Sequence, residues 1–430
     1  MSKISFIHLS DIHFVKSSNN PDDIDKDLRN AILVDLKTNA KSILDNVVGI
    51  LVTGDVAFSG NDDEYNIAKD YLNEICEIFN IKPSDVYCVP GNHDVNQNVI
   101  MNSTFVPLAQ NAVDTANTVD IADREFSKYI SSENQNILFI PLENYNNFAR
   151  RFECDISNNK IFWQKHFKLA DNFYFRIIGI NSSFLSTKED HITGKQMYIG
   201  QSQIPDYSDG TATLLMCHHP PECWKFKEDI LPRINKRADI QLYGHMHSQS
   251  FDITENNVIL YSGAVHPTRT VDWLPRYNWF SIEGELENNE RLLTIEIFPR
   301  CLSTDRDSFT IDSVCGQEKN SIRHKINIDK KRKETLEDSQ PCLNNVKLIQ
   351  QSPVDNAYIV FDEREIIYNF YDLSWVKQID ILTYLDLISD KDKSKSIATV
   401  LTNAINRAKE QDKLESLHKK ILEEINLEVK

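Results

Sequence analysis

The chain has 430 residues, of which 41% are apolar and 10% aromatic, enough for two or three folded domains. Its formal net charge of −17 argues against a general nucleic-acid-binding protein, because phosphate backbones are bound by clustered lysines and arginines. The first residues do not resemble a signal peptide, and no stretch approaches the roughly 18 apolar residues of a membrane-spanning helix. The eight cysteines are scattered as in reduced proteins, so we expect a cytoplasmic protein without a membrane partner.

Three predicted strands in the first hundred residues each end in polar side chains. These are Asp11 and His13 after strand 4–9, Asp55 after strand 47–52, and Asn92, His93 and Asp94 after strand 85–89. Helical spacing of apolar residues over 31–44 and 65–79 separates the strands, which predicts parallel α/β architecture. Loops at the carboxyl ends of such strands are where ligands bind. Asn92 could offer an oxygen to a metal and His93 a proton, while Asp94 could orient that imidazole.

Residues 95–172 interrupt the alternation, with two predicted helices over 121–130 and 142–152. A long insertion directly after a site loop is typical of a cap or lid.

The second half of the predicted domain repeats the pattern of strands that end in polar side chains. Strands are predicted over 173–181, 213–217, 239–243 and 258–262, and 279–285 with 292–298 predicts a closing hairpin. The histidines that follow these strands are His218 and His219, then His245 and His247, then His266.

The five motifs, in the order D-x-H, G-D-x, G-N-H-D, H-H-P and G-H-x-H, resemble those of the calcineurin-like metallophosphoesterase superfamily from residue 1 to about residue 300. The resemblance implies an α/β fold, a four-layered α/β sandwich, with two metal ions at the strand ends. It implies that Asp11, His13 and His247 hold one ion, that Asn92, His218 and His245 hold the other, and that Asp55 bridges them. Mixed nitrogen and oxygen ligands suit two divalent ions of Mn²⁺, iron, Zn²⁺ or Co²⁺, and we favour Mn²⁺.

The resemblance also implies a reaction. Two ions about 3.5–4 Å apart would clamp a phosphoryl oxygen and generate a bridging hydroxide, which would attack phosphorus in line. His93, paired with Asp94, would act as the general acid for the leaving oxygen. His219, His266 and Arg269 are candidate substrate contacts, although a structural role is the simpler interpretation of each.

The form His218-His219-Pro220-Pro221 is similar to the fourth motif of the cyclic-nucleotide branch of the superfamily, so we expect hydrolysis of a nucleotide or cyclic-nucleotide phosphodiester. The alternative is a metal-dependent DNA or RNA nuclease, an effector in a bacterial conflict or defence system. The acidic charge and the lack of a long coiled-coil segment count against it. A third hypothesis is a non-catalytic scaffold, against which the intact set of ligands argues.

The composition changes after residue 300. Residues 301–345 predict a linker or extension, including the basic run 330–333, which is expected to be solvated. Residues 346–430 predict an all-α bundle of at least three amphipathic helices. This module resembles the death-fold-like effector-associated domains of bacterial conflict systems, which implies a protein partner. A plain helical dimerisation or packing domain is the alternative.

Overall fold

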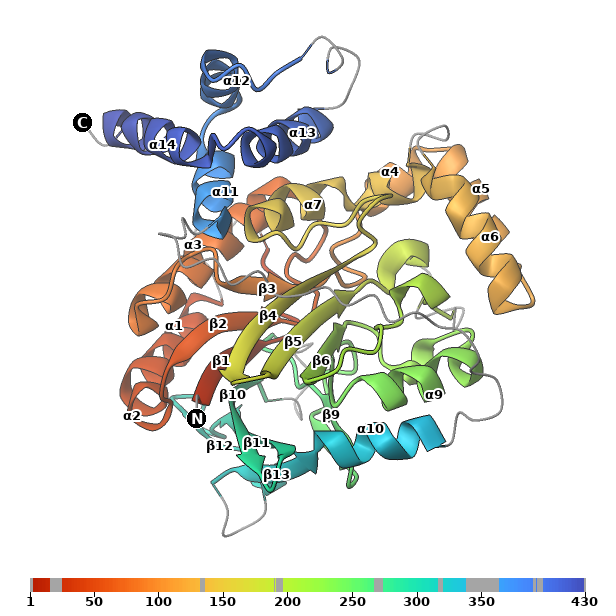
Figure 1. Ribbon diagram of the computed structural model, residues 1–430, viewed down its shortest axis with the longest axis vertical. Helices are drawn as coiled ribbons and strands as arrows, with labels where there is room; N and C mark the ends of the chain where they lie inside the picture. The colour runs from red at the N-terminus through yellow and green to blue at the C-terminus, as the bar shows by residue number, and fades with distance from the viewer. Residues whose placement is uncertain are drawn as a thin grey trace. The chain divides into compact units, whose positions relative to one another are not determined.

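The computed structural model divides into two compact units (Figure 1). The first contains Met1–Ala149 and Cys154–Cys342, and the second contains Arg150–Glu153 and Leu343–Lys430. The residues that the structure describes are 3–15, 25–131, 136–188, 190, 196–266, 274–315, 320–337, 363–389, 392 and 397–428. Among the helices of these residues, none has the length and apolar character needed to span a bilayer.

The first unit is built on two β-sheets. The 7-stranded sheet has the order β12-β11-β10-β1-β2-β3, with β13 also paired to β11. Strands β1, β2 and β3 run parallel, whereas β10 and β11 form a long antiparallel hairpin beside β1. The strands are β1 (Lys3–Leu9), β2 (Val47–Val52), β3 (Val86–Cys88), β10 (Arg276–Glu287), β11 (Glu290–Leu302), β12 (Phe309–Ile311) and β13 (Ile322–Asn327).

The 6-stranded sheet has the order β4-β5-β6-β7-β9-β8. Its four inner strands are parallel and almost wholly apolar, as expected for strands that are covered on both faces. The strands are β4 (Phe162–Ala170), β5 (Phe173–Ile180), β6 (Thr211–Cys217), β7 (Ile240–Tyr243), β8 (Ser250–Ile253) and β9 (Val258–Tyr261).

The two sheets pack face to face through aromatic side chains. The ring of Phe6 on β1 lies 5.5 Å from that of Phe167 on β4 and 6.2 Å from that of Phe175 on β5. Tyr87 on β3 lies 6.1 Å from Trp163 on β4. Because such rings bury large apolar areas, this layer fixes the two sheets against each other.

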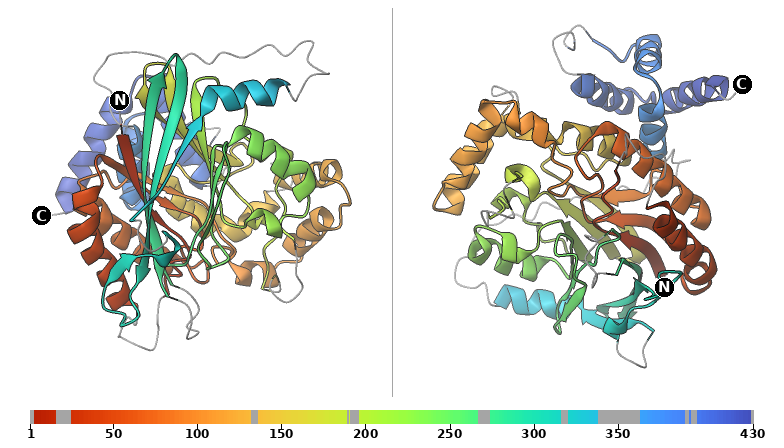
Figure 2. Two further views of the ribbon diagram at one scale, coloured as in Figure 1. Left: turned by 90° about the horizontal axis from the view of Figure 1, so that it is seen from below. Right: turned by 180° about the vertical axis from the view of Figure 1, so that it is seen from behind.

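Helices cover the outer faces of both sheets, as Figure 2 shows. The N-terminal helices lie on one side and α9 and α10 on the other, so the layers are helix, sheet, sheet and helix. This confirms the predicted four-layered sandwich. The helices are α1 (Lys26–Asp35), α2 (Lys41–Ile43), α3 (Asp62–Phe79), α9 (Lys227–Arg237) and α10 (Ile328–Glu337).

The segment 95–172, predicted as a cap, is helical at first but ends in a strand of the second sheet. Its last element, β4, pairs with β5 and contributes Trp163 to the interface between the sheets. Alternation of apolar and polar residues along β4 suits an edge strand. The helices are α4 (Gln97–Met101), α5 (Phe105–Asp114), α6 (Val119–Ile130) and α7 (Glu143–Ala149), followed by a 3-10 turn at Arg150–Phe152.

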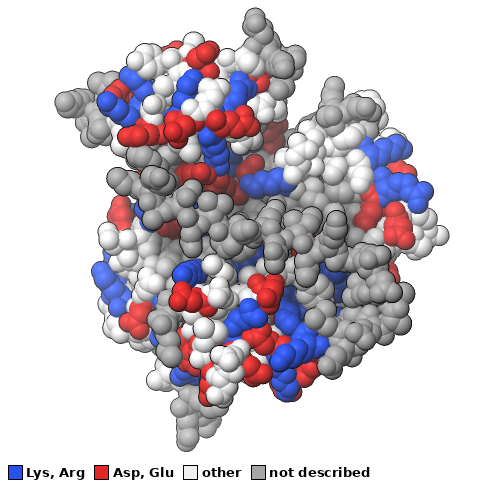
Figure 3. Space-filling view, in the orientation of Figure 1, with Lys and Arg blue, Asp and Glu red and all other residues white. Residues whose placement is uncertain are grey.

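The described residues of the segment predicted as a linker or extension form regular structure as far as residue 337. It contains β12, β13 and α10, and its basic run is only partly solvated. Lys331 is 3% exposed, and its Nζ lies 2.8 Å from a carboxylate oxygen of Asp239, which Arg332 also contacts at 3.1 Å. Figure 3 accordingly shows basic and acidic side chains intermingled over this face of the first unit.

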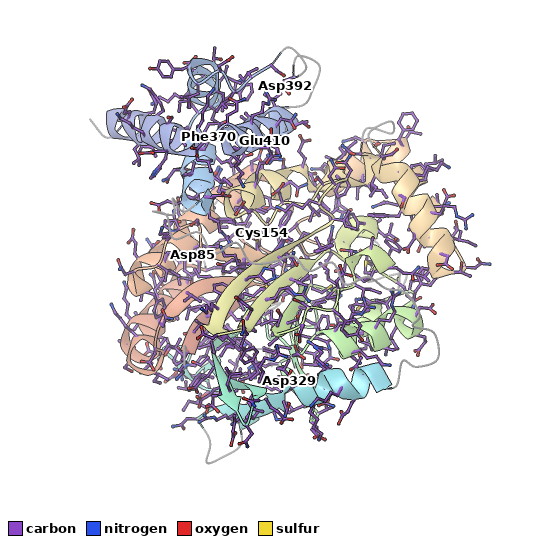
Figure 4. All side chains as sticks on the ribbon, viewed as in Figure 1. Asp85, Cys154, Asp329, Phe370, Asp392 and Glu410 are labelled. Atoms are coloured by element: carbon purple, nitrogen blue, oxygen red, sulfur yellow. The ribbon has the colours of Figure 1, made fainter. Side chains whose placement is uncertain are left out.

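The second unit contains four helices among its described residues, which confirms the predicted all-α module. They bury a core that includes Phe370, Leu382, Ala404 and Leu417, each fully inaccessible to solvent. Figure 4 labels Phe370 among these helices. The helices are α11 (Glu363–Asp372), α12 (Trp375–Tyr384), α13 (Ile397–Glu410) and α14 (Leu414–Glu428). Their 3.6-residue apolar periodicity explains why the sequence predicted helices here.

Candidate metal centre

The loops after β1, β2, β3, β6 and β7 bring side chains from five separate parts of the chain together. Potential ligand atoms lie within 4.8 Å of one another in each of several overlapping groups. The groups are Asp11, His13 and His247; Asp11, Asp55 and His218; His13, Asp55 and His93; and His218, His219 and His245. The parallel strands direct their carboxyl ends to one edge, so these contacts follow from the topology.

Asp55 lies at the centre of the cluster and is 1% exposed. Its Oδ2 is 3.1 Å from Nε2 of His13 and 3.3 Å from Nε2 of His218. Its Oδ1 accepts the backbone N–H of His93 at 2.8 Å. Burial alone would raise the pKa of Asp55, but the neighbouring charge of His218 and the histidine hydrogen bonds hold it well below the ordinary value. Asp55 is therefore ionised and faces histidines from both halves of the cluster.

Asn92 and Asp11 each lie beside different histidines of the cluster. Oδ1 of Asn92 is 3.1 Å from Nε2 of His218 and 3.0 Å from Nδ1 of His245. Oδ1 of Asp11 is 3.2 Å from Nε2 of His247. The structure thus groups Asn92 with His218 and His245, and Asp11 with His247.

Backbone carbonyls fix the orientation of two of the imidazoles. Nδ1 of His218 lies 2.9 Å from the carbonyl oxygen of Thr53, and Nδ1 of His13 lies 3.3 Å from that of His266. A carbonyl can only accept, so each Nδ1 carries a proton; a neutral imidazole then directs the lone pair of Nε2 at Asp55, whereas an imidazolium donates to it from Nε2. Metal-binding histidines are usually anchored in this way.

When these imidazoles are neutral, their Nε2 lone pairs face the carboxylate oxygens of Asp55. Such a buried arrangement requires a cation between the nitrogen and the oxygen. Burial alone would lower the pKa of His218, yet the charge of Asp55, together with its hydrogen bond, raises it to about 9. A proton or a metal ion can supply that positive charge, and ligands of mixed nitrogen and oxygen suit a transition-metal ion. The residues present therefore fit divalent metal ions.

The backbone at these positions adopts conformations that L-residues rarely take. The φ angles are positive at five of the proposed ligands: Asp11 (52°), His13 (52°), Asp55 (51°), His245 (68°) and His247 (55°). Each such residue costs about 1–3 kcal/mol, and strain of this kind gathers at functional sites. The surrounding bonds hold it in place, since the carbonyl of Asp55 accepts the N–H groups of both Ile12 and His13 at 3.0 Å.

Two of the glycines in this region show how closely the loops approach one another. A Cβ atom on Gly91 would lie 2.0 Å from Oδ1 of Asp55, and one on Gly54, where φ is +92°, would lie 2.5 Å from Nδ1 of His218. Both loops therefore need a residue without a side chain.

The predicted pairing of His93 with Asp94 is wrong. Nδ1 of His93 instead donates to the backbone carbonyl of Phe58 at 2.8 Å. The carboxylate of Asp94 is fully buried and accepts N–H groups of Gly91, Val56 and Ala57 and the hydroxyl of Tyr65, at distances from 2.9 to 3.2 Å. Asp94 therefore links the loop after β2 to the loop after β3. Sequence reasoning missed Phe58 because a backbone carbonyl leaves no signal in residue type.

The three predicted substrate contacts differ in their surroundings. His219 is buried, with Nδ1 2.8 Å from Oγ of Ser182, and its ring lies 4.5 Å from that of His245. The imidazole of His266 lies 2.7 Å from a carboxylate oxygen of Asp25. Arg269 is outside the described residues.

Comparison with known proteins yields two family matches. Residues 4–249 match the model of the calcineurin-like phosphoesterases, and residues 362–423 match that of the GTPase-associated adaptor domain. The chain is 26% identical over 312 residues to the uncharacterized metallophosphoesterase-like protein YydB of Bacillus subtilis. The aligned region covers 69% of this chain and 60% of that protein.

The solved structures found by comparison are more distant. A putative 5′-nucleotidase from Staphylococcus aureus is 13% identical, with a TM-score of 0.34, over 78% of this chain and 58% of that one. Vps29 from Entamoeba histolytica is 12% identical, with a TM-score of 0.29, over 75% of this chain and 99% of that one. Because the first family model spans more than half of the sequence, the chain belongs to the calcineurin-like phosphoesterase family.

Proposed function

We propose that this protein is a metal-dependent phosphoesterase that hydrolyses a phosphodiester of a nucleotide or cyclic nucleotide. The observation that carries the proposal is the buried cluster in which the Nε2 atoms of His13 and His218 lie within 3.3 Å of oxygens of Asp55 and Asn92. Such a cluster is stable only around positive charge, and its family relationship supports phosphate-ester chemistry. The curated relative is longer than this chain, which spans 60% of it, so the activity of the whole protein is part of the proposal.

The proposed metal centre holds two divalent ions, with Mn²⁺ favoured. Asp11, His13 and His247 would hold one ion, Asn92, His218 and His245 would hold the other, and Asp55 would serve both. When bound, the ions supply Lewis-acid stabilisation of phosphoryl oxygens and a lowered pKa for water.

His93 is the proposed proton donor to the leaving oxygen. Its Nδ1 proton is held by the carbonyl of Phe58 at 2.8 Å, so Nε2 is the atom that gains and loses the transferable proton. Its backbone N–H is bound to Asp55 at 2.8 Å, which keeps this histidine beside the cluster. Asp94 holds the same loop through Gly91 and contributes positioning rather than proton transfer.

The net charge of −17 and the mixed charges on the face shown in Figure 3 favour a small nucleotide over a long nucleic acid. The seven described cysteines form no disulfide with one another and six of them are buried, in keeping with the proposed cytoplasmic location.

The test is hydrolysis by the protein loaded with Mn²⁺. We expect cleavage of bis-p-nitrophenyl phosphate and of at least one cyclic nucleotide, loss of both on chelation, and loss of Mn²⁺ binding in Asp55→Asn. Cleavage of single-stranded DNA alone would favour the nuclease instead. An inactive protein that binds no metal would support a scaffold.

We further propose that the second unit recruits a protein partner. Its match to an adaptor domain and its lack of clustered catalytic side chains among the described residues support this role. Removal of residues 346–430 should leave hydrolysis of small esters largely intact and abolish partner binding. A folded truncation without any hydrolytic activity would contradict the separation of roles.

A further inference from the structure

An exposed aromatic side chain lies against the proposed catalytic histidine. Phe58 is 48% exposed, whereas most phenylalanines of this chain are buried in the core. Its ring centroid is 5.2 Å from that of His93, at an interplanar angle of 34°, and 6.1 Å from that of His13. The ring of Phe58 therefore lies beside two site histidines, and about half of the residue remains exposed.

Two more exposed apolar side chains adjoin the metal motifs. Val15, two residues after His13, is 47% exposed, and Met246, between His245 and His247, is 46% exposed. The backbone N–H of Phe58 donates to the carbonyl of Phe14 at 3.1 Å, so the loops that carry Val15 and Phe58 are neighbours. Exposed apolar groups beside a polar centre are typical of ligand sites, where a few polar groups fix an otherwise apolar ligand.

The geometry of His93 indicates which part of a ligand would meet Phe58. Nδ1 of His93 is bound to the carbonyl of Phe58, so Nε2 is the nitrogen that remains for a ligand, and His93 forms one group of potential ligand residues with His13 and Asp55. The oxygen that takes a proton from Nε2 must lie within hydrogen-bond reach of it. The atoms beyond that oxygen then lie next to the histidine ring, where Phe58 is the adjacent apolar surface.

We propose that Phe58 is a stacking platform for a flat ring carried by the substrate on the leaving-group side, such as a nucleobase. This deepens the proposed phosphoesterase function and rests on it for the position of the phosphate. Every base has a π-face, so stacking gives affinity with little discrimination among bases. The platform thus selects nucleotides over sugar phosphates.

The test is calorimetric binding of adenosine 5′-monophosphate and ribose 5-phosphate to the full chain loaded with Mn²⁺. These ligands share the phosphate and the sugar and differ in the base. We expect the nucleotide to bind about tenfold more tightly, equivalent to about 1.4 kcal/mol, within the range for one stacked base. Phe58→Ala should abolish this preference and leave ribose 5-phosphate binding unchanged, whereas Phe58→Trp should retain it.

The matched control is Leu286→Ala, which shortens a side chain that is 49% exposed on the β10–β11 hairpin. It should keep the wild-type preference. If Phe58→Ala does not fold, as judged by thermal unfolding, Phe58→Leu keeps an apolar side chain without the π-face and should also lose the preference.

Equal affinity of the wild type for both ligands would overturn the platform. So would an equal loss of affinity for both ligands in Phe58→Ala, since that result would mean that the ring only positions His93. Hydrolysis of bis-p-nitrophenyl phosphate is measured on the same preparation. If the protein does not hydrolyse this ester but still prefers the nucleotide, the esterase function is refuted and the proposed ring-binding site is retained.

Discussion

Replacing Gly91 with alanine should disable the metal centre while leaving the fold largely intact. The added Cβ would lie 2.0 Å from Oδ1 of Asp55 and 2.5 Å from its backbone nitrogen, whereas ordinary contacts begin at 3.4 Å. The backbone nitrogen cannot rotate away as a flexible side chain can, so the two loops must separate by about 1 Å. A misplacement of about 1 Å can cost about 100-fold in rate. Overpacking of this kind costs about 1–3 kcal/mol of stability.

The matched control for this prediction is Gly49→Ala. A Cβ on Gly49 would lie 2.5 Å from Cε2 of Tyr87 and 2.8 Å from the carbonyl oxygen of Asp85, also a severe overlap. Gly49 lies in the first half of β2, whereas Asp55 follows the other end of that strand. We expect both variants to lower the melting temperature, but only Gly91→Ala to lose Mn²⁺ binding and hydrolysis of bis-p-nitrophenyl phosphate. Wild-type Mn²⁺ affinity and rate in Gly91→Ala would refute the reasoning, as would equal losses in Gly49→Ala.

His93→Gln should lower the rate of ester hydrolysis by about 10²–10⁴-fold, the usual contribution of a general acid, with Mn²⁺ affinity unchanged by calorimetry; a rate within threefold of wild type would contradict its role. Asp94→Asn should cost about 1–3 kcal/mol in urea unfolding, because the amide nitrogen would replace one of the two oxygens and face the N–H group of either Val56 or Ala57, and unchanged stability would argue against the bonds described. Burial, opposed by a nearby carboxylate, lowers the pKa of His8 to about 3. Below pH 6.5 the unfolded chain binds a proton at His8 and the folded chain does not, so the stability present above pH 6.5 is lost as the pH falls toward 3. The wild type should therefore lose stability relative to His8→Gln by about 1.4 kcal/mol per pH unit below 6.5, and parallel curves of unfolding free energy against pH would exclude this linkage.

The sequence by itself determined the architecture and the membership of the cluster. Apolar strands that alternate with amphipathic helices predict parallel sheets, and polar residues just after five of those strands predict one site, because parallel strands end at one edge. The long closing hairpin was also predicted, and Asn288 and Asn289 at its turn adopt positive φ values, which suits a two-residue turn. These features are encoded locally, in spacing and residue type.

Only the tertiary structure decided what each side chain contacts. A backbone carbonyl, and not Asp94, orients His93, and the carboxylate of Asp94 instead binds backbone N–H groups of the loops. Lys331 packs against a buried carboxylate, where the basic run predicted a solvated surface. The tertiary structure also placed Phe58 against the site histidines. A carbonyl is present at every residue, and a charged side chain becomes buried only when a distant strand supplies its partner. Pairings of this kind depend on loops that meet in space, so spacing along the chain does not reveal them.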